Sequence, residues 1–251
     1  PQAYLSKNPH FCKSALSRYT QWDIIALLES FQLSWKEKRL GQLFCDQKSG
    51  AVLSALLKNC ENADIKLNIE VLKITKEHGY IISTNKEKYQ AESLVIATGG
   101  PSIPKMGASD FGLNIANQFG LKSIPFKPGL VPFTFHQQDI NIYFKNLSGI
   151  SIDVIVSCNH TIFREQMLIT HRGLSGPSIL QISSYWEKGN PIQIDLLPDL
   201  DAAEYLLNMQ QQRGKVLLKN ILSKFFPNRL ANRFANTLGQ KQNADTPLSE
   251  I

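Results

Sequence analysis

The sequence predicts an α/β fold in which one strand–turn–helix unit stands among helical and β-rich regions. Three observations support this prediction. Residues 94–97 are an apolar run that ends at paired glycines and precedes a helical pattern at 111–119. Apolar and polar residues alternate with a period of two at 65–71 and again at 152–157. The first sixty residues and those after 198 repeat instead with the 3.6-residue period of helices.

The N-terminal region is predicted to be helical. Thr20, followed three residues later by Asp23, resembles a capping box that opens an amphipathic helix. A second apolar stripe at 52–60 predicts another helix. The intervening residues 40–44 are interpreted as an extended segment or turn.

A small antiparallel meander is predicted next. The alternation at 65–71 changes phase near Val71, which indicates a β-bulge or strand break there. A turn at 78–79 leads into a strand at 80–84, and residues 88–91 are a third short strand candidate.

Residues 94–97 are apolar at every position, as expected of a strand buried on both faces in a parallel sheet. Ser109 or Asp110 is placed to cap the covering helix at 111–119, and Gly120 follows its end. The carboxyl end of such a strand is where open α/β sheets bind ligands, and glycines allow close approach. The alternative is a Gly-Gly turn that leaves a buried strand without binding anything.

Prolines and glycine crowd residues 125–132, and this change in composition predicts a domain boundary. Beyond it we expect a β hairpin that turns at 159–160, then a short helix with Pro177 in its first turn. Helical patterns at 217–225 and 229–238 follow.

Composition narrows the class of protein. The 251 residues include 27 Lys and Arg against 21 Asp and Glu, a formal charge of +6, but the cations are scattered, so we expect no nucleic-acid partner. No apolar run approaches the roughly 20 residues of a membrane-spanning helix, so no membrane partner is expected. The spacing of the four cysteines and five histidines predicts neither a disulfide framework nor a metal site. A reducing, cytoplasmic setting fits this pattern.

A second candidate site lies at 170–177. The segment lacks the G-x-S-x-G pattern of a hydrolase nucleophile, which excludes that role for Ser175. Ser175 could instead cap the helix entered at Pro177, with His171 and Arg172 beside its positive end, as an anion or substrate site. A capped turn with an exposed arginine explains the same residues equally well.

Five ordered motifs resemble the bacterial BaiN/RdsA-type, YhiN-like NAD(P)/FAD-dependent oxidoreductases. The resemblance runs through essentially the whole chain. The motifs are LGQLF at 40–44, LVIATGGPSIP at 94–104, GASDFG at 107–112, GLVPF at 129–133 and THRGLSGPSILQISSY at 170–185.

The resemblance implies a Rossmann-like FAD-binding domain interrupted by an insert. By motif, residues 1–127 would form the incomplete FAD domain, 128–198 a β-barrel-like insert and 199–251 its helical part. Val71 would hold adenine through its backbone, and a second set of residues would pass beside the flavin dinucleotide. That second set is Ala97, Thr98, Gly99 and Gly100.

The sequence departs from the family pattern at both ends. The G-x-G-x-x-G turn and the ribose-binding acid that should precede residue 1, and the family's closing segment, are absent, so we interpret the chain as an internal fragment. Because a hydrogen bond to a charged group contributes about 1.5 to 3 kcal/mol, loss of two pyrophosphate contacts weakens FAD binding roughly 100- to 10,000-fold.

The leading hypothesis is an FAD-dependent oxidoreductase that exchanges a hydride between flavin and a small-molecule substrate or NAD(P)H. No catalytic acid or base is identified in the sequence. One alternative is a non-catalytic binding or assembly module that does not retain flavin. Another is a nucleic-acid binder that uses the formal charge of +6, which a steep salt dependence of DNA or RNA binding would support.

Overall fold

The computed structural model describes residues 4–6, 8–38, 41–238, 245 and 247–250. The chain divides into two compact units, Pro1–Ser123 and Ile124–Ile251. In the described residues, no helix is long and apolar enough to cross a membrane.

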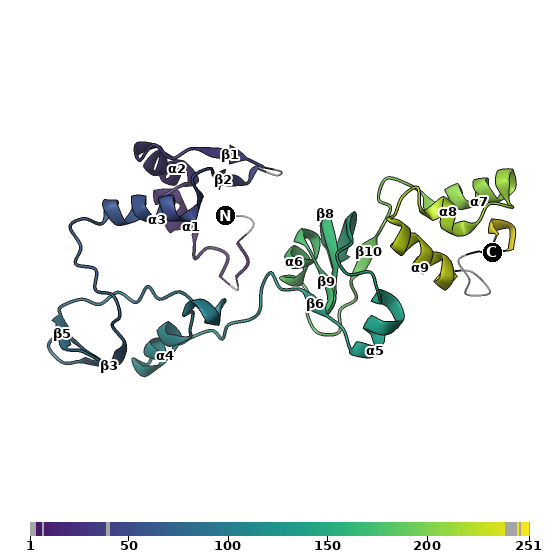
Figure 1. Ribbon diagram of the computed structural model, residues 1–251. Coiled ribbons are helices and arrows are strands. Elements are labelled where there is room, and N and C mark those ends of the chain that lie inside the picture. The colour runs from purple at the N-terminus through teal and green to yellow at the C-terminus, as the bar shows by residue number, and fades with distance from the viewer. Residues whose placement is uncertain (1–3, 7, 39–40, 239–244, 246, 251) are drawn as a thin grey trace. The chain divides into compact units, whose positions relative to one another are not determined.

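The first unit begins with helices and a two-stranded ribbon (Figure 1). The backbone N–H of Thr20 donates to Asp23 Oδ2 at 2.6 Å, so the predicted capping box is confirmed. Antiparallel strands β1 and β2 follow, and part of the predicted 40–44 segment lies in β2, whereas Leu40 lies outside the described residues. The elements are α1 (Lys13–Arg18), α2 (Gln21–Ser30), β1 (Trp35–Glu37), β2 (Leu43–Cys45) and α3 (Lys48–Asn59).

The predicted meander is confirmed as an antiparallel sheet of β3 (Val71–Lys76), β4 (Tyr80–Thr84) and β5 (Lys88–Ala91). Its register shifts between Val71 and Lys73, where the sequence predicts a bulge. The strand predicted to start at residue 65 begins only at Val71. The remaining elements of this unit are η2 (Pro104–Met106) and α4 (Phe111–Gln118).

The second unit contains a five-stranded antiparallel sheet with the order β10-β7-β8-β9-β6. The expected hairpin is present, with Asn159 in the left-handed conformation (φ +54°) at its turn. In the described residues the edge strands β10 and β6 do not pair, so the sheet is open. Its strands are β6 (Phe133–Thr134), β7 (Ser151–Cys158), β8 (Thr161–Thr170), β9 (Gly173–Ser175) and β10 (Gln193–Asp195).

Helices of the second unit contribute to one core with this sheet. Helix α6 (Pro177–Ser183) contacts β7, β8 and β9, and Pro177 occupies its first turn as predicted. The predicted helix at 217–225 is shorter, because α8 ends at Leu222. The other helices are α5 (Gln137–Asp139), η3 (Ile140–Phe144), α7 (Ala202–Arg213), α8 (Leu218–Leu222), α9 (Asn228–Leu238) and η4 (Leu248–Glu250).

The core joins alternate residues of the sheet to helix residues distant in sequence. Val154 and Val156 on β7 are fully buried, as are Ile179 and Ile182 on α6. Ala231 on α9 belongs to the same cluster. The period-two and period-3.6 apolar patterns therefore meet in one core.

Candidate functional site

The glycine-containing segment 94–100 does not form the predicted strand. Val95 is 83% exposed and Ile96 37%, so the prediction of a strand buried on both faces is wrong. No described strand pairs with this segment, and an isolated apolar run has no partner for its backbone N–H and C=O groups.

The same segment is positioned by helix α4. A Cβ placed on Gly112, in the first turn of α4, would lie 3.3 Å from Thr98 Oγ1 and 3.3 Å from the Ile96 side chain. Glycine therefore lets the helix backbone approach residues 96–98 closely. Gly99 adopts a left-handed φ of +70°, and the space where its Cβ would stand is open.

The other end of α4 is attached to the meander. Gln118 Nε2 donates to the Ile74 carbonyl of β3 at 2.6 Å, and Tyr80 and Phe119 make an edge-to-face ring contact. Gly112 and Gln118 are separated by roughly 9 Å along the helix, at 1.5 Å per residue. Helix α4 thus connects the glycine segment to the strand that begins at Val71.

These residues fit part of a dinucleotide site. Ala97, Thr98 and Gly99 are exposed, Gly100 is half-buried, and the left-handed glycine leaves open space beside the backbone. The arrangement that binds pyrophosphate is a glycine turn between a parallel strand and the helix that follows it. The described part of the chain does not contain this arrangement. Contact between these residues and FAD stays a prediction.

The proposed capping role of Ser175 is wrong. Ser175 ends β9, and Gly176 occupies the N-cap of α6 with φ +94°. A Cβ on Gly176 would lie 2.7 Å from the Gln166 carbonyl oxygen of β8, so the chain needs glycine at the residue that enters the helix. Ser175 is consequently one position too early to cap it.

His171 and Arg172 are exposed at the tight turn between β8 and β9. The Arg172 backbone N–H donates to Thr170 Oγ1, and its carbonyl accepts from Phe135 N–H. Neither side chain makes a hydrogen bond or ion pair with the described residues. An anion or substrate site at His171, Arg172 and Ser175 remains a prediction, without the helix cap that suggested it.

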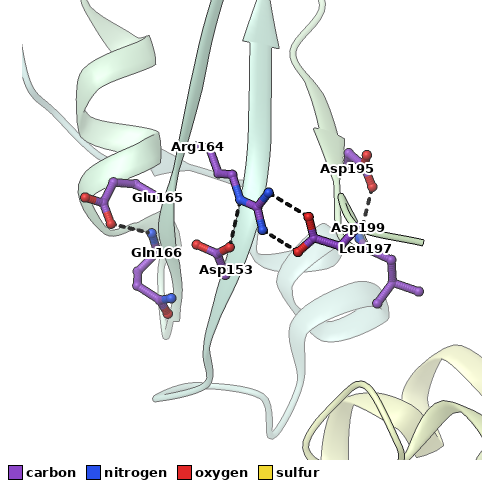
Figure 2. Close-up of polar contacts among 7 residues, drawn as sticks. All are labelled: Asp153, Arg164, Glu165, Gln166, Asp195, Leu197 and Asp199. Carbon is purple, nitrogen blue, oxygen red and sulfur yellow. Dashed lines mark hydrogen bonds and ion pairs between the residues drawn. The ribbon is translucent and has the colours of Figure 1, made fainter. Parts of the chain in front are cut away.

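A charge cluster that sequence reasoning missed lies on the sheet of the second unit (Figure 2). Arg164 Nε on β8 donates to Asp153 Oδ2 on β7 at 3.1 Å, and its terminal nitrogens bind both carboxylate oxygens of Asp199. Hydrogen bonds from Arg164 lower the pKa of Asp199, while the two carboxylates raise the pKa of Arg164. In the hairpin register Asp153 lies opposite Gln166 and Arg164 lies opposite Ile155, so the contact between Asp153 and Arg164 is diagonal. It could be inferred only once that register is known.

Beside this sheet lies an apolar cavity of about 280 Å³ between the strands and α9. Met167, Ile169 and Phe234 contribute to its wall, and Arg233 and Tyr143 line it with them. Sequence reasoning missed this cavity because its lining residues, from Tyr143 to Thr237, are separated by up to 94 positions. Among the described residues, no group of three or more His, Cys, Asp or Glu is placed to hold a metal ion.

Comparison with known proteins gives three informative relatives. The chain is 48% identical over 244 residues to the "Ribosomal RNA dihydrouridine synthase" of Escherichia coli K12, covering 96% of this chain and 60% of that protein. It is 41% identical over 239 residues to the protein of the same name from Haemophilus influenzae, covering 92% and 59%. The "3-dehydro-bile acid delta(4,6)-reductase" of Clostridium scindens is 23% identical over 267 residues, covering 99% and 63%.

The chain therefore spans about three-fifths of the length of these curated relatives. The model of the HI0933-like protein Rossmann domain matches residues 1–229. This match confirms the expected Rossmann-like fold class and the resemblance based on the five motifs. The chain belongs to the HI0933-like Rossmann-domain family.

Proposed function

We propose that the protein containing this chain is a flavin-dependent oxidoreductase that reduces uridine in ribosomal RNA to dihydrouridine. The observation that carries the proposal is the identity of 48% and 41% to two proteins named for that reaction, across more than nine-tenths of the chain. The bile-acid reductase is a more distant relative, at 23%. This substrate replaces the small molecule expected from the sequence.

The names of these relatives describe related chemistry. Dihydrouridine differs from uridine by two hydrogens across a carbon–carbon double bond that is conjugated to a carbonyl. A 3-dehydro compound with double bonds at positions 4 and 6 also has its double bonds conjugated to a ketone. Reduction in both cases adds a hydride to one carbon and a proton to another, and bound FAD supplies the hydride chemistry.

The first unit would contribute one side of the flavin site. The backbone of Val71 would contact adenine, and Ala97, Thr98, Gly99 and Gly100 would run beside the dinucleotide, supported by α4 through Gly112. The open space at Gly99 and its left-handed φ support this assignment. NAD(P)H is the proposed reductant that resupplies electrons.

The flavin assignment is tested with Gly99→Val in the protein as it occurs in the cell. A β-branched residue at φ +70° costs of order 1–3 kcal/mol and would fill the open space, so flavin affinity should fall about tenfold or more. The matched control is Gly107→Val, because Gly107 also has a left-handed φ (+86°) and open space but lies outside the proposed contacts. The visible absorption of the purified proteins reports bound flavin.

Equal flavin loss in both variants would contradict a specific role for Gly99. A wild-type protein that stays colourless after FAD is added would favour the non-catalytic module instead.

The substrate is tested by measuring dihydrouridine in ribosomal RNA from cells with and without the gene, and after incubation of that RNA with purified protein and NAD(P)H. We expect dihydrouridine only where the protein is present. Reduction of a conjugated steroid ketone without any change in the RNA would instead favour a small-molecule reductase, the activity suggested by the Clostridium relative.

A further inference from the structure

A groove of about 320 Å³ lies between the end of η3 and the exposed face of α9. Its lining residues include three cations and three amides, and no acidic side chain is among them in the described chain. The lining residues are Lys145, Asn146, Leu147, Arg229, Asn232, Arg233 and Asn236.

Two of the cations are held in place by the loop that follows η3. Arg229 donates to the Asn146 carbonyl at 2.9 Å, and Arg233 donates to the Ile142 and Lys145 carbonyls at 3.1 and 2.9 Å. Asn146 has a left-handed φ of +64°, a conformation that asparagine tolerates better than most residues. Because guanidinium groups carry further N–H donors, both arginines stay able to bind an anion while their positions are fixed.

The sequence around this groove lacks compensating charge. Between Glu204 and Asp245 there are seven Lys or Arg residues and no Asp or Glu. Elsewhere in this unit Arg164 is paired with two carboxylates. In the described residues, Lys145, Arg229 and Arg233 make no ion pair, so the potential of the groove stays positive.

The groove adjoins the apolar cavity described above, because Leu147 and Arg233 line both. Tyr143, on the cavity wall, is 54% exposed, and its ring contacts that of Phe144 edge to face at 6.5 Å between centroids. A row of cations beside an exposed aromatic ring is the combination that binds a nucleic-acid strand whose bases are unpaired.

We propose that this η3–α9 face binds single-stranded RNA, with Lys145, Arg229 and Arg233 on phosphates and Tyr143 stacked on a base. This proposal rests on the proposed function, because the names of the two most similar of these relatives are the reason for choosing RNA among polyanions. Asn232 and Asn236, one helical turn apart on α9, are placed to hydrogen-bond sugar or base edges along the same strand. Single-stranded rather than duplex RNA fits, since stacking on Tyr143 requires an exposed base face.

The test measures binding of a fluorescently labelled, uridine-containing single-stranded RNA to the protein as it occurs in the cell, over a salt series. Lys145→Ala removes one cation whose side chain makes no ion pair with the described residues. Loss of one phosphate contact should reduce the slope of log affinity against log salt by about 0.7, which is about fivefold in affinity at 0.1 M salt. Lys188→Ala is the matched control, because it removes the same charge from an exposed position outside the groove.

A second variant, Asn232→Glu with Asn236→Glu, adds negative charge to the groove without removing a side-chain hydrogen bond among the described residues. It should weaken RNA binding about tenfold or more, while flavin content and thermal unfolding stay at wild-type values. Tyr143→Leu should also weaken binding, with an unchanged salt slope.

The outcomes separate this proposal from the proposed function. If the wild-type protein forms dihydrouridine but the groove variants bind RNA like wild type, the η3–α9 proposal is overturned and the function stands. If the groove variants lose RNA binding and the control does not, the proposal holds even where no dihydrouridine forms. Absence of RNA binding by the wild-type protein overturns it.

Discussion

The two units of the chain differ in how much apolar surface they bury. In the described residues of the first unit, the buried hydrophobic residues are Cys12, Ala55 and Ile74. The second unit has a continuous core that runs from Leu147 to Leu248 and includes sheet and helix residues. Because apolar burial is the main favourable contribution to folding, the second unit should account for most of the stability.

The first unit exposes large apolar side chains at positions where the sequence predicts strands. Leu67 is 73% exposed and Val95 83%, yet both occupy positions where the sequence predicts a strand. Such surface is usually buried against other protein or ligand. The chain spans about three-fifths of the length of its curated relatives.

The largest expected effect comes from the core of the second unit. Ile182 on α6 is fully buried, and its replacement by Ala should lower the free energy of unfolding by about 2–5 kcal/mol. The matched variant Val95→Ala in the first unit should change it by less than about 0.5 kcal/mol, because that side chain is 83% exposed. Urea unfolding of this chain measures both, and similar costs for the two variants would contradict the comparison.

A smaller effect is expected where the β-sheet meets α6. Gly176 has a left-handed φ, and a Cβ added there would lie 2.7 Å from backbone atoms of β8. Gly176→Ala should therefore lower the free energy of unfolding by about 2–3 kcal/mol. Gly189 has a similar φ of +99° but open space, so Gly189→Ala should cost only about 1 kcal/mol. Thermal unfolding of the two variants separates strain from close packing. Equal losses of stability in the two variants would show that the backbone near Gly176 moves away from β8 without a further loss of stability.

Secondary structure that depends on local sequence patterns was predicted well, whereas strand pairing between distant segments was not. The hairpin of β7 and β8 follows from strict alternation and a turn at Asn159, all within twenty residues. The strand at 94–97 failed because a strand needs partners, and its apolar composition does not supply them. Ser175 was assigned a cap by residue type alone, whereas the backbone conformation required Gly176.

The candidate RNA face was missed for a different reason. Sequence reasoning considered whether Lys and Arg form a dense cluster, and between residues 205 and 244 they are spaced apart along the sequence. The absence of acids over the same stretch is the informative signal, because scattered cations sum to a positive face when nothing neutralises them. Only the fold shows that Lys145, from a distant loop, joins Arg229 and Arg233.

The smallest predicted effect concerns the Arg164 cluster on the surface of the second unit. Arg164 lowers the pKa of Asp199, so the folded state favours the charged carboxylate. This contribution to stability is fully present above the unfolded pKa of about 3.9 and is lost as pH falls through the lower folded value. Asp199→Asn should therefore be less stable than wild type at neutral pH, and the difference should shrink as pH falls below about 4.

Glu187→Gln is the matched control for that variant, because it removes the same charge from an exposed position whose side chain makes no ion pair with the described residues. Its melting temperature should follow the wild-type pH profile. High salt should reduce the Asp199 effect, since both partners contact solvent and ions screen them. A difference that persists unchanged at low pH would mean that Asp199 positions the loop through hydrogen bonds that an amide or a neutral carboxyl also makes.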